Sequence, residues 1–525
     1  MIRIVLTLLA FITAYVAYKA ILYPRFFSPL RSFPGPPLPL RSALLGHTPA
    51  FVNSEPGLAQ LKWARKYGPV VRFAGPLGVE GLVLMKPEAL HRVFIADVET
   101  YPKPPFMMEL LGLVAGYGLF TAHGAEHAQM RKAINPVFST SNIVAQMEMY
   151  FDTTEVLVER MNACLEGRAS DGTVLHMYEW VARATLDIVC DTVLGYPYHS
   201  LPDPDSELAK VWNDLLPIQS TETLALLSFV LSIPGVSPIL KSKFGYKLQH
   251  VFKLAAATEP LNIFVNFLHN ARRISRQILH AKLKEDAADS ETKKDIVSLL
   301  LKTRKAAEGS KSGYTMSDEA LTEHIQTFIG AGHESSASGL AWLLWLLASH
   351  PSIQAELRAH VAPVFATTTS RPTYQQVKDL RMLDNVVMEG LRLFPPVPAL
   401  LRQATATAVV DGVPIPKGTL LNIPVRAMNM REDIWGADAA AFRPARWTSL
   451  SKEATATFGL MTFGAGPRMC IGKEMALAEM RVVLATLVAN FEFLPAYKGQ
   501  TANATAAITM KPKDNMPLLV KPVRR

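Results

Sequence analysis

The chain has 525 residues, 49% of them hydrophobic, which is enough for one large enzyme domain or for two to three average domains with a substantial core. Its formal net charge is +9, but the Lys and Arg residues are scattered, which argues against a nucleic-acid-binding protein and favours an anionic membrane surface or an acidic partner protein. Only three cysteines occur, far apart, so a disulfide framework and a Cys-x-x-Cys zinc site are excluded, and Cys164 and Cys190 are expected to be small buried hydrophobes.

An apolar stretch opens the chain. Residues 4–18 carry no charge, and residues 20–23 continue the apolar run after Lys19. About 20 residues at roughly 1.5 Å each span about 30 Å, so residues 1–23 are predicted to be a transmembrane anchor, with Lys19 extending to the lipid headgroups. A cleaved signal peptide is the alternative, but no clear small-x-small cleavage site follows the run. More arginines follow this stretch than precede it, which predicts that the rest of the chain lies in the cytosol.

A proline-rich segment, Phe-Pro-Gly-Pro-Pro-Leu-Pro at residues 33–39, follows the anchor. Closely spaced prolines favour an extended and stiff backbone. We therefore expect residues 24–42 to be a linker that orients a catalytic domain against the bilayer. Residues 43–525 contain no internal repeat and no low-complexity segment, and are expected to form one domain.

The remaining pattern is mostly helical. The clearest predicted helices are Ile143–Cys164, Met177–Leu194 and Asp318–Ser349. Strands are predicted at Val70–Phe73, Gly81–Met85 and Thr419–Ile423, and the Asp411-Gly412 pair between apolar residues predicts a hairpin. The expected fold class is mainly α with small β-sheets.

The sequence Phe-Gly-Ala-Gly-Pro-Arg-Met-Cys-Ile-Gly at residues 463–472 carries the most specific signal. It resembles the FxxGxRxCxG haem loop of cytochrome P450s at every specified position. The resemblance implies that Cys470 is the axial thiolate ligand of a haem b iron, that Phe463 belongs to the haem-binding loop, and that Arg468 pairs with a haem propionate. The three glycines, at positions 464, 466 and 472, are expected to permit tight turns, and a helix at Lys473–Asn490 is expected to direct its N-terminal dipole at the sulfur.

Two further segments extend the resemblance. Glu389 and Arg392 form an ExxR pair on one helix face, and residues 442–447 (Phe-Arg-Pro-Ala-Arg-Trp) stand where the family carries its third member, here Arg446. The family's usual Pro-Glu-Arg-Phe is Pro-Ala-Arg-Trp in this chain. The resemblance implies a buried charge network of these three residues; read alone, the ExxR pair is an ordinary surface ion pair.

Residues 331–336, Ala-Gly-His-Glu-Ser-Ser, resemble the oxygen-activation segment of the family. Gly332 is expected to permit a local widening of the helix where dioxygen could sit. Glu334 and Ser335 are expected to form an acid–alcohol pair that delivers protons. Serine stands where threonine is usual, and it lacks the methyl group that restricts the rotamer, so product formation could be less tightly coupled to the reductant.

His127 and Arg131 resemble the aromatic-xxx-Arg segment of the family, with histidine where tryptophan is common. Both are expected to contact haem propionates, as is Arg402. Otherwise His127 and Arg131 would be a solvated helix face. Substrate-facing candidates are apolar, and each could equally be core: Phe106, Met107, Met108, Leu110, Leu111, Val397–Leu400 and Ile508–Met510.

The family and its microsomal, eukaryotic, fungal-like branch imply a monooxygenase of the endoplasmic reticulum membrane. It would insert one atom of O2 into a terpenoid, polyketide or fatty acid of secondary metabolism. No Gly-rich dinucleotide or flavin fingerprint occurs, so electrons from NADPH are expected through a separate NADPH–cytochrome P450 reductase. The alternatives are a haem-thiolate isomerase or dehydratase that rearranges a peroxide without reductase, and a non-catalytic membrane haem protein. The Glu334–Ser335 pair argues against both.

Overall fold

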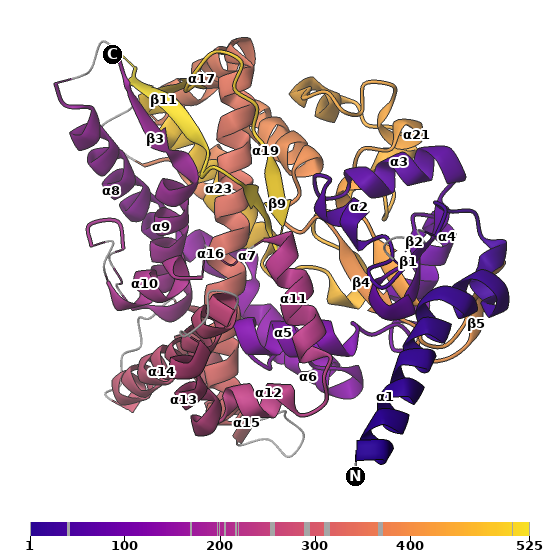
Figure 1. Cartoon of the computed structure of the whole chain (residues 1–525). Coiled ribbons are helices and arrows are strands. Elements are labelled where there is room, and N and C mark those ends of the chain that lie inside the picture. The colour runs from indigo at the N-terminus through magenta and orange to yellow at the C-terminus, as the bar shows by residue number, and fades with distance from the viewer. Residues whose placement is uncertain are drawn as a thin grey trace. The chain divides into compact units, whose positions relative to one another are not determined.

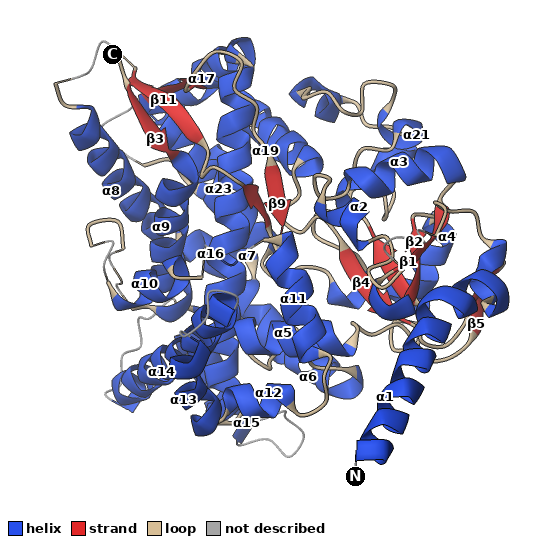
Figure 2. Ribbon diagram, in the orientation of Figure 1, coloured by secondary structure: helices blue, strands red, loops and turns tan. Residues whose placement is uncertain are grey.

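The structure, a computed structural model, describes residues 2–38, 43–167, 171–196, 198, 200–203, 206–215, 218, 220–252, 258–287, 295–308, 316–365, 371–506 and 508–523. Helices make up most of it and the strands form small sheets, so the predicted fold class is confirmed (Figure 1, Figure 2). The chain divides into two compact units. Unit 1 comprises Met1–Pro104, Val397–Ala441 and Ser451–Cys470, and unit 2 comprises Pro105–Pro396, Phe442–Leu450 and Ile471–Arg525.

The elements of unit 1, in which η marks a 3-10 or π-helical turn, are α1 (Ile2–Ala17), η1 (Tyr18–Phe27), η2 (Pro29–Ser32), α2 (Thr48–Val52), α3 (Leu58–Tyr67), β1 (Val70–Ala74), η3 (Pro76–Gly78), β2 (Glu80–Leu84), α4 (Pro87–His91), η4 (Arg92–Ala96), β4 (Leu400–Gln403), β5 (Ala408–Val410), β6 (Val413–Ile415), β7 (Leu420–Ile423), α20 (Val425–Met428), α21 (Glu432–Trp435), α22 (Lys452–Thr455) and η10 (Gly466–Arg468).

A four-stranded sheet in the order β1-β2-β7-β4 organises unit 1. Its β-branched and aromatic residues face the core, and Val71 and Phe73 are only 0% and 3% exposed. β2 and β7 run parallel, whereas β1 and β4 each pair antiparallel with their neighbour. In the register of β4 and β7, Arg402 lies opposite Leu421. The sheet thus fixes the backbone of one predicted cofactor-binding residue.

The predicted hairpin is present as β5 and β6. Its two turn residues, Asp411 and Gly412, have φ of 49° and 73°. Two successive positive φ values are what a tight two-residue hairpin turn requires, and Asp-Gly tolerates them. The three predicted strands also begin and end within one residue of β1, β2 and β7.

The N-terminal helix is long and apolar enough to cross a membrane over Leu6–Phe27. The end of this helix lies on unit 1, where Ala20 is 6% exposed and the carbonyl of Pro24 accepts a hydrogen bond from Arg72. The proline-rich segment also lies there, because Arg72 N–H donates to Pro34 O at 2.9 Å. A Cβ on Gly35 would lie 2.3 Å from Arg72 O, so this contact needs glycine. The segment is therefore packed against β1, as a linker that orients the anchor would be.

The elements of unit 2 are α5 (Pro105–Ala115), α6 (Gly124–Ile134), η5 (Asn135–Phe138), α7 (Thr140–Ala145), α8 (Met147–Leu165), β3 (Thr173–His176), α9 (Met177–Val189), η6 (Cys190–Leu194), α10 (Glu207–Asn213), α11 (Thr221–Leu231), α12 (Val236–Lys241), α13 (Lys243–Phe252), α14 (Glu259–Ala287), α15 (Ile296–Glu308), α16 (Asp318–Ser349), α17 (Pro351–Phe365), α18 (Tyr374–Lys378), α19 (Arg381–Leu393), η9 (Pro444–Thr448), α23 (Lys473–Asn490), β8 (Phe491–Pro495), β9 (Ala504–Ala506), β10 (Met510–Pro512) and β11 (Pro517–Pro522).

The long helix α16 is the centre of unit 2, and α5, α9, α14, α19 and α23 all contact it (Figure 1). Ser317 caps its N-terminus by accepting a hydrogen bond from the N–H of Ala320. The negative charges of Asp318 and Glu319 in the first turn interact favourably with the positive end of the helix dipole. Its 32 residues span about 48 Å at 1.5 Å per residue. Most of its side chains are buried, so tertiary packing stabilises it along its whole length.

Two predicted helices, α16 and α23, begin and end at the predicted residues. The predicted helix Ile143–Cys164 is interrupted at Gln146, whose side chain is buried and donates to Thr192 O at 2.9 Å. The predicted helix Met177–Leu194 is present, with a π-helical last turn in η6. The break at Gln146 thus comes with a long-range contact that no local pattern reveals.

The prediction for the two structural cysteines is half right. Cys190 is fully buried, and burial raises the pKa of its thiol well above the usual value. Cys164 is exposed, so the expected buried position is wrong. The reason is its place on α8, where the buried face carries Leu157, Met161 and Leu165, four residues apart, and Cys164 lies off that face.

Candidate active site

Cys470 ends unit 1 in a loop that starts at Phe463. Cys470 is exposed. Its backbone N–H donates to Phe463 O at 2.9 Å, and this hydrogen bond closes the loop. Gly464 and Gly466 have φ of 71° and 70°, in the left-handed region that favours glycine. A Cβ on Gly466 would also lie 2.1 Å from Phe94 O, so only glycine permits this approach to η4. The loop therefore holds the thiol of Cys470 in a constrained turn.

The third glycine of the motif behaves differently. Gly472 has φ of −87°, an ordinary value, and the nearest atom that its Cβ would meet is 3.9 Å away. The protein atoms alone therefore do not require glycine here, and the expectation that Gly472 lets the chain turn tightly against a porphyrin stays a prediction. Gly472 is the N-cap of α23, which follows Cys470 in the chain.

Three cations gather near the loop within unit 1. Arg402 is 4% exposed, and its guanidinium lies 4.9 Å from the centre of the Phe94 ring. Burial and the charge of Arg468 lower the pKa of Arg402 to about 10. Burial, Arg402 and Arg468 together lower the pKa of Lys103 to about 7. Glu99, 3.9 Å from Arg468, counters only part of this positive charge. Such a cluster, which we call the cation cluster (Lys103, Arg402 and Arg468), favours a bound anion.

The thiol and the cation cluster fit a haem. A cysteine thiolate is one of the protein ligands of haem iron, and the propionates of haem are carboxylates that cations stabilise. Arg402 and Arg468 were predicted for this role, and the structure brings them together. Lys103 was missed, because no motif marks it; it stands between two prolines in the sequence.

The other two predicted propionate contacts belong to unit 2. His127 and Arg131 lie on α6, with His127 6% exposed. Arg131 Nε donates to Asn135 Oδ1 at 2.9 Å. Their role toward haem stays a prediction.

The carboxylate of Glu389 is the centre of a buried network in unit 2. Its two oxygens accept from Arg392 Nε at 2.9 Å and from Arg392 Nη2 at 2.8 Å, and both residues are 0% exposed. Arg446 Nε, 3.1 Å away, and Arg443 N–H, 3.0 Å away, donate as well. Burial raises the pKa of the Glu389 carboxyl, but these donors outweigh it and the net pKa is lowered. The structure thus brings together the three residues that the sequence predicted.

The departure from the usual family sequence adds a donor to this network. Trp447 Nε1 donates to Glu389 Oε2 at 3.0 Å. Ala445 does not take part in it, which agrees with the expectation that the loss of an acid there leaves Arg446 in place. The indole contact was missed, since a tryptophan in that position reads as a hydrophobic residue.

The predicted oxygen-activation segment is in the middle of α16. The expected widening at Gly332 is absent, because α16 is a regular α-helix there. A Cβ on Gly332 would lie 2.7 Å from Val189 Cγ2, so this glycine lets α9 pack closely. Thr185 Oγ1 of α9 also donates to His333 O at 3.0 Å. Gly332 is therefore a position where α9 and α16 pack closely.

Glu334 and Ser335 each have their own partner. Ser335 Oγ donates to Ala331 O, one turn back, at 2.8 Å. Glu334 Oε1 accepts from Thr509 Oγ1 at 2.7 Å. Both residues are half-buried. The acid is therefore oriented by the segment before β10 and the alcohol by its own helix.

An apolar cavity in unit 2 has Glu334 as the one charged residue among the described residues that line it. The other lining residues are apolar, and they are Leu110, Val114, Leu215, Ile218, Leu224, Leu227, Phe264 and Ile508. Leu110 and Ile508 were predicted to face substrate, and the cavity places both beside Glu334. The residues from the α10–α11 region and from α14 were missed, because leucine and phenylalanine in helices read as ordinary core. Val397–Leu400 belong to unit 1, where Pro398 O accepts the N–H of Arg426 at 3.1 Å.

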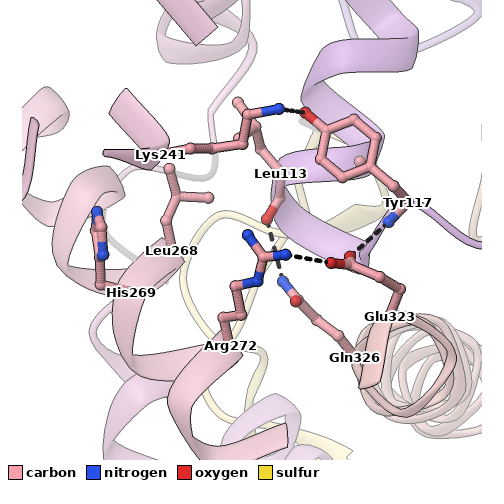
Figure 3. Close-up of a pocket in the computed structure, with 9 residues that line it drawn as sticks. Leu113, Tyr117, Lys241, Leu268, His269, Arg272, Glu323 and Gln326 are labelled. Atoms are coloured by element: carbon pink, nitrogen blue, oxygen red, sulfur yellow. Dashed lines mark hydrogen bonds and ion pairs between the residues drawn. The ribbon is translucent and has the colours of Figure 1, made fainter. Parts of the chain in front are cut away.

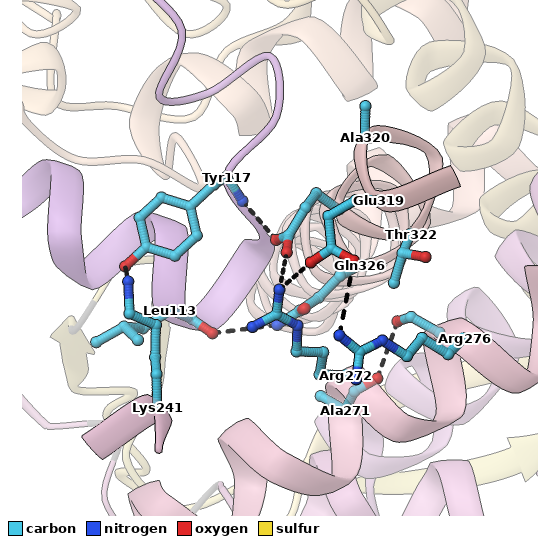
Figure 4. A network of polar contacts seen from close by, with 12 residues as sticks. Leu113, Tyr117, Lys241, Ala271, Arg272, Arg276, Glu319, Ala320, Thr322 and Gln326 are labelled. Atoms are coloured by element: carbon cyan, nitrogen blue, oxygen red, sulfur yellow. Dashed lines mark hydrogen bonds and ion pairs between the residues drawn. The ribbon is translucent and has the colours of Figure 1, made fainter. Parts of the chain in front are cut away.

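A second pocket in unit 2 is polar (Figure 3). Lys241 Nζ donates to Tyr117 OH at 3.2 Å, and Tyr117 N–H donates to Glu323 Oε2 at 2.8 Å. Arg272 Nη2 pairs with Glu323 Oε1 at 2.9 Å and also with Glu319 (Figure 4). These contacts join α12, α14 and the segment before α6 to α16. Pairing of the polar groups with one another supports a structural role for this pocket.

Comparison with known proteins gives a consistent result. A family model described as Cytochrome P450 matches residues 36–519. The chain is 27% identical over 521 residues to the cytochrome P450 monooxygenase sphH of Aspergillus fumigatus, covering 96% of this chain and 91% of that protein. It is 28% identical over 547 residues to cytochrome P450 monooxygenase 128 of Postia placenta, covering 98% and 96%. It is 27% identical over 538 residues to the cytochrome P450 monooxygenase FUM15 of Gibberella moniliformis, covering 92% and 86%.

The match runs through both units and includes the loop of Cys470, the Glu389 network and the segment around Glu334. These relatives align over most of their own length. The chain belongs to the cytochrome P450 family and is a cytochrome P450 monooxygenase.

Proposed function

We propose that this monooxygenase inserts one oxygen atom of O2 into a lipophilic small molecule, with electrons that NADPH supplies through a separate reductase. The lining of the apolar cavity carries the proposal, since every lining residue that the structure describes is apolar except Glu334. Such a lining favours a ligand with a large apolar surface, because removing that surface from water is favourable. Terpenoids, polyketides and fatty acids all meet this requirement, and secondary metabolism is the setting that the family resemblance suggests.

When bound, haem b supplies the activation of dioxygen at its iron. Cys470 would ligate that iron as a thiolate, and the cation cluster would bind the propionates. Glu334 and Ser335 would move protons into the cavity, the carboxylate by exchange with solvent and the hydroxyl by holding a water.

The membrane is the second part of the proposal. We place the N-terminal helix in the endoplasmic reticulum membrane, with the catalytic part of the chain in the cytosol. A second contact surface on unit 2 is supported by exposed apolar side chains of α11 to α13, among them Phe229, Ile239 and Phe244, which are 51%, 46% and 64% exposed. Lys241 and Lys243 lie beside them in sequence, and cations attract anionic lipids.

Deletion of residues 1–23 tests both contacts. The truncated enzyme is expected to remain partly bound to anionic vesicles at low salt and to be released by adding Phe229→Ser and Phe244→Ser. Co-sedimentation measures the bound fraction. Complete solubility of the truncated enzyme at low salt would contradict the second surface.

Ser335 gives the sharpest test of the monooxygenase reaction. Ser335→Ala is expected to keep haem and substrate binding, because the hydroxyl donates only to Ala331 O. It should consume NADPH while releasing more hydrogen peroxide per product, since proton delivery is impaired. Ser335→Thr restricts the rotamer and should couple at least as well as wild type.

The measurement is peroxide and product per NADPH, with purified reductase and a substrate found by its shift of the haem absorption band. Ser349→Ala, at the exposed end of the same helix, is the matched control. An alanine variant at position 335 that couples as wild type would remove Ser335 from the proposed relay. Product formation without NADPH or reductase would instead indicate a peroxide-rearranging isomerase or dehydratase, and no turnover of any substrate a non-catalytic haem protein.

A further inference from the structure

One face of α16 is attached to the chain at residues 509–510. Glu334, Ser338 and Trp342 lie four residues apart and so share this face. Thr509 Oγ1 donates to Glu334 Oε1 at 2.7 Å, Ser338 Oγ donates to Met510 O, and Trp342 Nε1 donates to the same carbonyl at 3.2 Å. Three polar side chains in a row therefore hold the start of β10 along α16.

A second segment of the chain also holds the start of β10. Met510 is 0% exposed, and its N–H donates to Pro396 O at 2.7 Å. In the hairpin register Lys511 lies opposite Thr505. Because β10 is held by α16 and by the segment after α19, Thr509 has little freedom to move relative to Glu334.

Several ionisable groups surround the Glu334 carboxylate. Lys511 of β10 is 7% exposed; burial lowers its pKa to about 8, and attraction to Glu334 opposes that lowering. Tyr178 of α9 is buried, which raises the pKa of its hydroxyl, and the charge of Glu334 raises it further. His333 of α16 is buried, which lowers the pKa of its ring, while Glu334 opposes the effect. The carboxylate therefore has one nearby ammonium group and one direct hydroxyl donor from the same hairpin.

The same turn also meets the apolar cavity. Ile508, directly before Thr509, lines it together with Glu334. A ligand that presses on Ile508 thus contacts the residue next to the donor that holds the acid.

We propose that Thr509 is a positioning residue for proton delivery, which holds the Glu334 carboxylate in its working orientation, and that Lys511 supports it by electrostatic attraction. The inference rests on the proposed function, because it assigns to Glu334 the proton-delivering role. Thr509→Val keeps the shape of the side chain and removes the donor. The Glu334 carboxylate then loses the hydrogen bond that fixes its orientation.

The first test measures the contact without turnover. Thermal midpoints of the haem-loaded enzyme are compared for Thr509→Val, Glu334→Gln and the double variant. Non-additive shifts are expected, since each change removes one partner of the same hydrogen bond. Thr505→Val, at a half-buried position of β9 in the same hairpin, should add to Glu334→Gln without coupling. Additive shifts for Thr509→Val would overturn the contact.

The second test measures coupling. Thr509→Val is expected to release several-fold more hydrogen peroxide per product, Thr509→Ser to restore wild-type coupling, and Thr505→Val to leave it unchanged. Thr509→Val with wild-type coupling, or an equal loss in Thr509→Ser, would overturn the positioning role. Failure of the proposed function can be distinguished from failure of this inference. If the proposed function is wrong, the wild-type enzyme forms no NADPH-dependent product, but the thermal midpoints still test the contact between Thr509 and Glu334.

Discussion

The Glu389 network and the cation cluster are both buried, but burial has opposite outcomes in the two. In the network, donors from Arg392, Arg446 and other residues lower the pKa of Glu389 and so stabilise its charge. In the cluster, burial and like charges lower the pKa of Arg402 to about 10 and that of Lys103 to about 7, which destabilises their charges. The network is complete within the chain, whereas the cluster gains most when an anion is bound.

This difference separates a structural charge site from a binding site. Substitution in a complete network leaves an uncompensated buried charge, so the folded state loses stability. Substitution in a crowded cluster relieves repulsion between like charges, so we expect the ligand-free protein to lose less stability than in the network and the bound ligand to be held more weakly. Four measurements test this difference, and the variant expected to lose the most stability comes first.

Glu389→Gln should produce the largest loss of stability. An amide in place of the carboxylate leaves Arg392 buried without its counter-charge and turns an NH2 group toward donors. Breaking a buried pair costs about 3–5 kcal/mol in the free energy of unfolding. Urea unfolding of the purified protein measures it. Glu432→Gln, which removes an exposed pair with Arg65, should cost less than about 1 kcal/mol. Equal losses in the two variants would contradict a complete buried network.

Cys470→Ser should change the ligand site without a comparable loss of stability. A serine hydroxyl ionises far less readily than a thiol, so it cannot replace an anionic sulfur. The reduced, carbon-monoxide-treated variant is expected to bind little haem or to lack the thiolate-type red-shifted Soret band. Cys164→Ser, at the other exposed cysteine, should keep that band. Retention of the band in Cys470→Ser would show that another residue is the ligand.

Lys103→Met should have effects of opposite sign with and without haem. Because the folded chain lowers the pKa of Lys103 to about 7, its charge opposes folding, and the haem-free protein should gain in thermal midpoint. The haem-loaded protein should lose haem several-fold faster, as followed by transfer to an acceptor protein. Lys86→Met, which removes a surface pair with Asp411, should leave the rate of haem loss unchanged. Unchanged haem loss in Lys103→Met would remove this lysine from the site.

Glu479 extends the comparison to a second buried carboxyl group. It is 2% exposed, accepts from Ser336 Oγ at 2.7 Å, and its Oε1 has no hydrogen-bond partner among the described residues. Burial raises the pKa of its carboxyl from 4.5 to about 8, even though the Ser336 bond lowers it. Glu389 and Glu479 are both buried in unit 2. The pKa of Glu389 is lowered because arginines donate to it, whereas burial raises the pKa of Glu479.

The sign of the pH effect follows from that pKa. Glu479 loses its proton near pH 4.5 in the unfolded chain and near pH 8 in the folded chain. Its stabilising contribution is therefore complete below pH 4.5 and declines up to pH 8, by about 1.4 kcal/mol per pH unit. Urea unfolding at pH 6 and pH 7.5 measures the free energy of unfolding. The value for Glu479→Gln should rise relative to that of wild type as the pH increases. A constant difference between the two proteins would mean that Glu479 is already ionised at pH 6.

Local patterns in the sequence were sufficient for several elements. α16 and α23 begin and end as predicted, since capping residues and apolar periodicity act over a few residues. The Asp411-Gly412 turn follows from the φ values that a two-residue hairpin needs. The Cys470 loop was recognisable because its glycines and its cysteine stand at fixed positions in ten consecutive residues.

Other features depended on contacts between distant segments. Lys103 joins Arg402 and Arg468 only through folding, and its own neighbours in sequence carry no signal of that. The α9 contact that makes Gly332 a packing glycine brings together residues more than a hundred positions apart. Thr509 likewise reaches Glu334 across 175 positions.

The sequence by itself thus determined the class of the fold, the family and the residue types of the chemistry, because these depend on short-range geometry and on spacing along the chain. The tertiary structure decided the charge state and the partner of each ionisable group. The pKa of Glu389, Glu479 and Lys103 depends on burial and on charges that arrive from other elements, and neither quantity is encoded in neighbouring residues.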